Sequence, residues 1–186
     1  MLQFGFETHL CYCNLENLGL DIDHLEQLCE KHKPSLLIIC DVLGHINDMK
    51  RIYEICDKFD ILLLEDSCEA LGSEVNQKKL GTFGLAGSFS FYYGHHISTI
   101  EGGMVVTDDQ QLFNLMRSIR SHGWGRDLES HEINRLKLKF NIDEFRNLYT
   151  FYYPGFNLRS TDLNAFLGLS QIKKMEGIVK KRSNNF

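Results

Sequence analysis

The chain has 186 residues, of which 43% are hydrophobic and 24% are charged, and its formal net charge is −5. These values are typical of a globular domain of ordinary size. The negative charge gives no reason to expect a nucleic acid or an anionic membrane as a partner. No apolar run approaches the ~18 residues needed to span a bilayer, and the N-terminal residues lack the basic segment and long apolar core of a signal peptide.

Residues 24–32 and 47–59 show the i, i+3, i+4, i+7 apolar spacing of an amphipathic helix. Asp21 or Asp23 is expected to cap the first helix, and Asn47 is expected to cap the second. Both segments therefore predict helices that pack one face against a core.

The continuous apolar runs at 35–40 and 60–66 are typical of strands buried on both faces. With the helix between them they form a βαβ unit of ~30 residues, so these two strands are expected to be parallel. Residues 87–93 and 103–107 predict two more strands, and 108–123 predict a helix. The pattern indicates an α/β fold with a mixed, mostly parallel sheet flanked by helices.

Residues 126–156 mix charged and aromatic side chains without a clean period, and we expect an irregular flap or excursion there. Residues 157–186 predict one long helix that Ser160 or Thr161 caps. Residues 1–125 are expected to form the central part of a larger domain.

The cysteines are scattered between positions 11 and 68, which suits reduced thiols of a cytoplasmic protein better than a disulfide framework. Only Cys11 and Cys13 lie close together in the sequence. A single C-x-C pair without a second pair nearby is weak evidence for a metal site. We therefore expect a cytoplasmic protein with no metal.

Acidic residues and histidines follow two of the predicted strands. Glu65 and Asp66 end one strand, and His95 and His96 follow the next long one. Ligands of parallel sheets bind beyond the carboxyl ends of the strands, so Asp66 and His95 are expected to face one crevice if the strands are near neighbours. An acid there can hold a protonated ring nitrogen of a cofactor, and a histidine can move protons. The residues alone leave another interpretation open, in which Asp66 caps a following helix and a histidine satisfies a backbone carbonyl.

Several motifs occur together in residues 62–109, namely E-D, G-T-F-G, S-F and E-G-G. Their order and spacing resemble the centre of the DegT/DnrJ/EryC1/StrS family, the sugar aminotransferases of fold type I that use pyridoxal phosphate. Residues 158–182, "LRSTDLNAFLGLSQIKKMEGIVKKR", are similar to the helix of that family that carries the motif N-x-R-x-T-D-x-x-A-x-x-G-x-x-Q. The resemblance implies part of the cofactor-binding large domain, without the N-terminal phosphate loop and the C-terminal small domain, and hence a fragment.

The resemblance also implies the cofactor, pyridoxal phosphate or pyridoxamine phosphate, and the residues that hold it. It implies that Asp66 pairs with the pyridinium nitrogen and that Ser90 bonds the cofactor phosphate. Asn157 matches an asparagine that reaches the phosphate in the neighbouring subunit, which implies a homodimer. Glu69 lies where the aminotransferases have a glutamine near the cofactor.

The chain departs from the family at the catalytic lysine, because the family spacing places His95 at that position. With a histidine at this position, the chain resembles the 3-dehydratase branch of the family, whose members make 3,6-dideoxysugars. The resemblance implies dehydration at C3 of a nucleotide-linked 4-keto-6-deoxyhexose in polysaccharide biosynthesis, with His95 as the acid–base residue and an amino donor such as glutamate. The segment after Gly-Arg-Asp (125–127) contains no cysteine, which disfavours an iron–sulfur cluster.

Two other interpretations remain. The loss of the lysine also fits an aminotransferase homologue that is a non-catalytic binding or assembly subunit, and a truncated chain could bind nothing alone. A metal site at the histidine pair is disfavoured, because adjacent side chains on a strand point to opposite faces.

Overall fold

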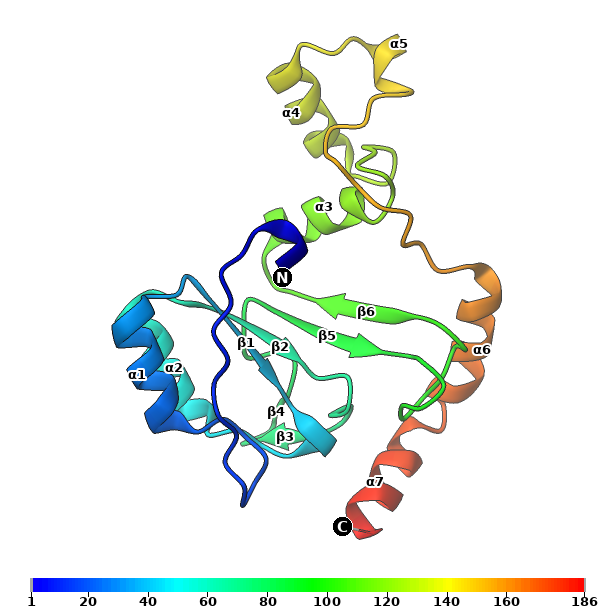
Figure 1. Cartoon of the computed structure of the whole chain (residues 1–186). Helices are drawn as coiled ribbons and strands as arrows, with labels where there is room; N and C mark the ends of the chain where they lie inside the picture. Colours follow the sequence, from blue (N-terminus) through cyan, green and yellow to red (C-terminus); the bar gives the residue numbers. More distant parts are fainter. Residues whose placement is uncertain (1, 186) are drawn as a thin grey trace. The chain divides into compact units, whose positions relative to one another are not determined.

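The computed structural model describes residues 2–185 and divides the chain into two compact units (Figure 1). One unit comprises Met1–Val106 and Phe166–Phe186, and the other comprises Thr107–Ala165. These divisions differ from the expected boundaries after 125 and 156. That residues 1–125 form the central part of a larger domain stays a prediction.

The first unit contains a four-stranded sheet, a two-stranded hairpin and helices. Its elements are η1 (Leu2–Phe4), α1 (Ile22–His32), β1 (Leu36–Cys40), η2 (Val42–Gly44), α2 (Met49–Phe59), β2 (Leu62–Asp66), β3 (Glu74–Val75), β4 (Lys78–Lys79), β5 (Ala86–Ser90), β6 (Gly103–Val106), most of α6 (Asp162–Ile172), and α7 (Met175–Asn185). The second unit contains α3 (Gln110–Ile119), α4 (Ser130–Phe140) and α5 (Glu144–Asn147).

The strands of the sheet lie in the order β1-β2-β5-β6. β2 is parallel to both β1 and β5, whereas β6 is antiparallel to β5. The sequence prediction of an α/β fold with a mixed, mostly parallel sheet is therefore confirmed. The predicted βαβ unit is the segment from β1 through α2 to β2.

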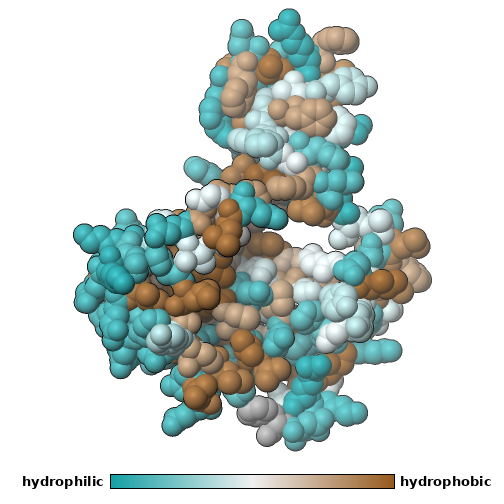
Figure 2. Space-filling model, in the orientation of Figure 1, coloured by the Kyte–Doolittle hydropathy of each residue, from teal (hydrophilic) through white to brown (hydrophobic). Residues whose placement is uncertain are grey.

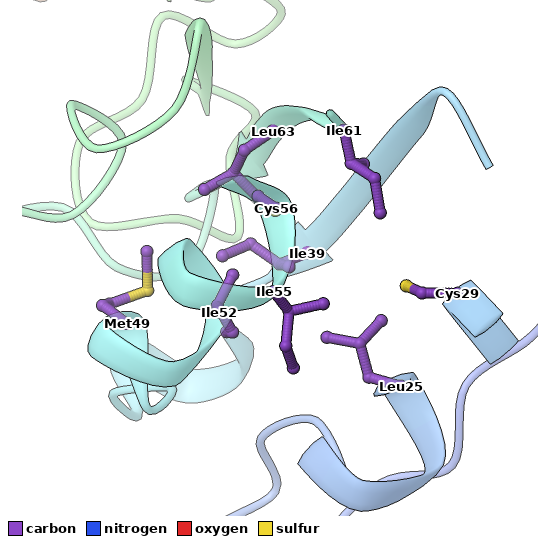
Figure 3. Close-up of a cluster of buried hydrophobic side chains, with 9 residues drawn as sticks. All are labelled: Leu25, Cys29, Ile39, Met49, Ile52, Ile55, Cys56, Ile61 and Leu63. Atoms are coloured by element: carbon purple, nitrogen blue, oxygen red, sulfur yellow. The ribbon is translucent and has the colours of Figure 1, made fainter. Parts of the chain in front are cut away.

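One face of the sheet packs against α1 and α2 (Figures 1 and 3). The buried cluster combines side chains of both helices with side chains of β1 and β2: Leu25, Cys29, Ile39, Met49, Ile52, Ile55, Cys56, Ile61 and Leu63. Ile39 and Ile52 are fully buried at its centre. The helical and strand periods of the sequence thus meet in one core.

The opposite face of the sheet is open. Ile38, Leu62 and Val105 are 46%, 54% and 50% exposed, respectively. Figure 2 shows apolar areas, in brown, among hydrophilic ones, in teal, on the side of the molecule that it draws. This open face matters because the strand register places the candidate site residues on it.

A buried polar network joins the ends of β1 and β2. The Asp41 carboxylate accepts hydrogen bonds from the Ser67 hydroxyl (2.6 Å) and from the Asn47 side-chain amide (3.2 Å). The Asn47 amide oxygen in turn accepts a hydrogen bond from the Leu20 amide at 2.8 Å. Asn47 is therefore occupied, and Asp48 caps α2 in its place by accepting from the Arg51 amide, so the prediction of Asn47 as cap is wrong.

The strand expected at 87–93 ends earlier, at Ser90. The two neighbouring strands explain this early end. β2 ends at Asp66, which pairs with Ser88, and β6 begins at Gly103, which pairs with Ser90. Beyond Ser90, the Phe91 amide still donates a hydrogen bond to the Gly102 carbonyl, and the chain then turns. The histidine pair consequently lies in this turn, where the argument from alternating strand side chains does not apply.

Two expectations for the C-terminal third are wrong. The predicted irregular segment 126–156 contains α4 and α5, and the single long helix is divided into α6 and α7. The break follows Gln171, whose side chain exchanges hydrogen bonds with both backbone groups of Ser98. The cap of α6 is confirmed, because the Thr161 hydroxyl accepts a hydrogen bond from the amide three residues later.

No helix within residues 2–185 is both long enough and apolar enough to cross a membrane.

Two adjacent isoleucines of β1 provide a test of this core. Ile39→Ala removes a fully buried side chain and should lower the free energy of unfolding by about 2–5 kcal/mol. Ile38→Ala is the matched control on the open face and should cost less than half as much. Urea unfolding followed by circular dichroism measures both, and equal losses would contradict the assignment of the two faces.

The Asp41 network predicts a pH dependence of stability. Burial raises the pKa of the Asp41 carboxyl above its ordinary value, although the hydrogen bonds from Ser67 and Asn47 oppose the shift. The pKa of Asp41 is therefore higher in the folded state than in the unfolded state. At a pH between these two values the folded state binds more protons than the unfolded state, so the stability that Asp41 contributes increases as the pH falls through this window.

We expect the difference in unfolding free energy between the parent and Asp41→Asn to shift in favour of the parent as the pH falls from neutral through the raised pKa of Asp41. Ser67→Ala removes a donor that lowers this pKa and should move the window to higher pH. Urea unfolding at each pH gives both quantities. A difference that stays constant with pH would show that Asp41 does not titrate as described.

Candidate functional site

Asp66 is the last residue of β2, a central strand of the sheet. Its register partner in β5 is Ser88, and Ser90 lies two residues further along that strand. Because side chains of a strand alternate with a period of two, Asp66, Ser88 and Ser90 lie on the same face. The structure therefore brings two of the predicted site residues, Asp66 and Ser90, to one face of the sheet.

The Asp66 carboxylate is only partly engaged. Its Oδ1 accepts hydrogen bonds from the Cys68 amide at 3.2 Å and from the Ser88 hydroxyl at 3.4 Å. Within residues 2–185, Oδ2 accepts no hydrogen bond from an N–H or O–H group, although the Cys68 thiol also interacts with this carboxylate. Residues 67–72 form turns and not the expected short helix, so Asp66 stabilises a turn and keeps one oxygen available.

Glu65 points to the opposite face and is 2% exposed. Its carboxylate accepts hydrogen bonds from the backbone amides of Gly81, Phe83 and Gly84 at 2.6–2.7 Å. The loop that contains the G-T-F-G motif is thereby fixed against β2. A Cβ at Gly87 would lie 1.9 Å from the Gly81 carbonyl oxygen, so this approach of the loop to β5 requires glycine.

His95 lies in the turn after β5. Its amide donates a hydrogen bond to the Tyr92 carbonyl at 3.1 Å, and its ring meets the Tyr92 ring edge-on at 6.4 Å between centroids. Asp66 and His95 make no direct hydrogen bond or ion pair in the part of the chain that the structure describes. Their sharing of one crevice stays a prediction.

His96 is half-buried beside a cavity of about 490 Å³. Glu69 and Arg182 also line this cavity, and the Glu69 carboxylate accepts a hydrogen bond from the Leu43 amide at 2.7 Å. Burial lowers the pKa of His96, and the positive charge of Arg182 and the neighbouring His95 lower it further. The His96 imidazole is therefore neutral at neutral pH, and its Nδ1 has no hydrogen-bond partner within residues 2–185.

Asn157 belongs to the second compact unit. It is exposed and forms an isolated antiparallel bridge with Ser121. Its action on a neighbouring subunit stays a prediction.

The cysteines are free thiols, in agreement with the sequence analysis. Cys40 and Cys68 adjoin Asp66, and burial, together with the Asp66 carboxylate, raises the pKa of both thiols, to about 11 for Cys68. They are therefore protonated at neutral pH and are poor metal ligands. Among residues 2–185, the pair Cys11 and Cys13 belongs to no cluster of three possible metal ligands.

The open sheet face fits the polar groups of a pyridoxal-type cofactor. A carboxylate with a free oxygen suits a protonated pyridine nitrogen, and serine hydroxyls on the same face suit a phosphate. Sequence reasoning predicted Asp66 and Ser90, but it missed the structural role of Glu65 and the cavity beside His96. The signal for Glu65 was present, because a carboxylate inside an apolar strand requires buried donors.

Two relatives place these features in a family context. The chain is 36% identical over 183 residues to the GDP-4-keto-6-deoxy-D-mannose 3-dehydratase of Yersinia pseudotuberculosis, covering 98% of this chain and 46% of that protein. It is 34% identical to the UDP-4-amino-4,6-dideoxy-N-acetyl-beta-L-altrosamine transaminase of Helicobacter pylori, covering 98% and 44%. The chain spans about half the length of these relatives.

The fold is also similar to a solved structure, that of the Escherichia coli GDP-4-keto-6-deoxy-D-mannose-3-dehydratase with bound hydrated PLP. The TM-score is 0.81 at 33% identity, and the match covers 94% of this chain and 44% of that one. The model of the DegT/DnrJ/EryC1/StrS aminotransferase family matches residues 1–186. The chain, with its mixed sheet and its motifs in family order, therefore belongs to the DegT/DnrJ/EryC1/StrS aminotransferase family.

Proposed function

We propose that this chain forms part of the cofactor site of a sugar 3-dehydratase that works with pyridoxamine phosphate. The observation that carries the proposal is the exchange of the family lysine for His95, while Asp66 and Ser90 remain on the open face of the sheet. The 3-dehydratases among its relatives support this choice over a transaminase.

Pyridoxamine phosphate, when bound, supplies an amine that condenses with a sugar ketone and a ring that accepts electrons. In this proposal the free oxygen of Asp66 holds the proton on the ring nitrogen. The Ser90 hydroxyl donates a hydrogen bond to the phosphate. Glu69, whose carboxylate accepts a hydrogen bond from the Leu43 amide, is proposed to lie near the cofactor.

His95 moves the proton that dehydration requires. A neutral imidazole takes a proton from the methylene carbon beside the cofactor amine, and the imidazolium then delivers a proton to the hydroxyl that leaves C3 of the sugar. A lysine at this position would instead bond the cofactor covalently. Histidine keeps the amine free.

The proposed substrate is a nucleotide-linked 4-keto-6-deoxyhexose, and the amino donor is an amino acid such as glutamate. The relatives support a GDP-linked sugar in particular. The proposed assembly is a homodimer, in which Asn157 reaches the cofactor phosphate of the neighbouring subunit. Its exposure on the second unit is compatible with that contact.

A second candidate is a subunit that binds cofactor or a partner chain but does not catalyse. The missing lysine fits this function as well, and the chain spans less than half of each relative. The two candidates differ in one respect, since only the dehydratase requires His95 for turnover.

We expect His95→Asn to retain pyridoxamine phosphate, because Asp66 and Ser90 are unchanged, and to lower the rate of sugar dehydration by about 10²–10⁴-fold. His95→Lys should allow borohydride to fix pyridoxal phosphate covalently to the protein, whereas the parent should not be labelled. Mass spectrometry of the labelled chain and of the sugar product measures both effects.

His96→Asn is the matched control and should retain most of the rate if His95 is the acid–base residue. Dehydration by His95→Asn at the parental rate would overturn the proposal. Cofactor binding by a parent that shows no turnover would favour the second candidate.

A further inference from the structure

A cluster of possible metal ligands lies away from the open sheet face, at the end of α1. Glu7 and His9 lie two residues apart on a segment without regular secondary structure, and His32 is the last residue of α1. The ligand atoms of these three side chains all lie within 4.8 Å of one another. Within residues 2–185, no other group of three histidine, cysteine or acidic side chains brings its ligand atoms so close.

The donors of this cluster are available. Nε2 of His9 lies 3.1 Å from a Glu7 carboxylate oxygen, and the rings of His9 and His32 stack with their centroids 3.6 Å apart. Across residues 2–185, neither ring nitrogen of His32 takes part in a hydrogen bond. The lone pairs of His32 are therefore not used by the fold.

The surroundings favour a cation. The C-terminal end of a helix carries partial negative charge on its last carbonyl groups, and His32 stands at that end of α1. The Glu7 carboxylate adds a formal negative charge. Lys31 is the neighbouring cation that opposes a metal ion, but its side chain is exposed to solvent.

We propose that Glu7, His9 and His32 bind a divalent transition-metal ion of the zinc class and thereby fasten the N-terminal segment to α1. Two imidazoles and one carboxylate are a ligand set that zinc accepts, with water in the fourth position. This site is independent of the proposed cofactor function, since it shares no residue with the open sheet face.

The geometry requires a small adjustment. Tetrahedral coordination with bonds of about 2.1 Å places the ligand atoms about 3.4 Å apart, so each atom must move by about 1 Å or less. The planes of the two stacked rings lie at 26° to each other, so one ring must turn about its Cβ–Cγ bond before both rings can direct a lone pair at the same ion. Glu7 and His9 have room to move, because their side chains are 83% and 31% exposed.

The test uses Zn²⁺ alone, added to the metal-free chain and followed by titration calorimetry. We expect one ion per chain at this site, with an affinity that falls by at least ~100-fold in His32→Asn and in His9→Asn, more than the loss of an outer-shell partner costs. His131→Asn is the matched control. The His131 ring also lies near a carboxylate, 3.3 Å from Glu129, but residues 2–185 supply no third ligand there, so its loss should leave the affinity unchanged.

Co²⁺ then reports the ligand type. The parent should give the absorption of a nitrogen and oxygen site, without a band from thiolate-to-metal charge transfer. Parental Zn²⁺ affinity in His32→Asn, or a thiolate band with Co²⁺, would place the ion elsewhere and overturn the proposal. Circular dichroism of each variant verifies that α1 still forms, and none of these readouts depends on cofactor or sugar.

Discussion

The buried carboxylate of Glu65 is the constraint on which the arrangement of the site depends. A carboxylate that is 2% exposed has to recover its lost hydration through hydrogen bonds, and Glu65 does so with three backbone amides of the 81–84 loop. This contact holds the loop beneath β2 and against β5. The register of β2 with β5 follows, and with it the position of Asp66 opposite Ser88 on the other face. Glu65 of the E-D pair thus fixes the loop beneath the sheet, and Asp66 presents its carboxylate to the open face of the sheet.

The sequence predicted the parts of the fold that local patterns determine. The helical spacing of α1 and α2 and the apolar runs of β1 and β2 led to the correct βαβ unit, because one buried core selects all of them. Features set by distant partners were not predictable in this way. β5 ends where its neighbours end, the Asn47 amide is diverted from capping by Asp41 and Leu20, and the helix after Thr161 breaks where Gln171 binds Ser98.

In the candidate site, too, local sequence patterns predicted some features, whereas distant partners determine others. Asp66 could be predicted because the end of an apolar strand is a fixed place in a parallel sheet. Its common face with Ser90 required the strand register. The cavity beside His96 could not be predicted, because Arg182 reaches it from α7, more than eighty positions along the chain. The cluster at the end of α1 is similar, since no spacing rule connects His9 with His32.

One paired measurement distinguishes the structural role of Glu65 from the proposed cofactor-binding role of Asp66. The affinity for pyridoxamine phosphate and the free energy of unfolding in urea are determined for Glu65→Gln and Asp66→Asn. Glu65→Gln should lose about 1–3 kcal/mol of stability, because its amide group cannot accept from all three backbone donors. Asp66→Asn should keep the parental stability and lose cofactor affinity. Parental affinity in Asp66→Asn, or parental stability in Glu65→Gln, would contradict this division of roles between the two carboxylates.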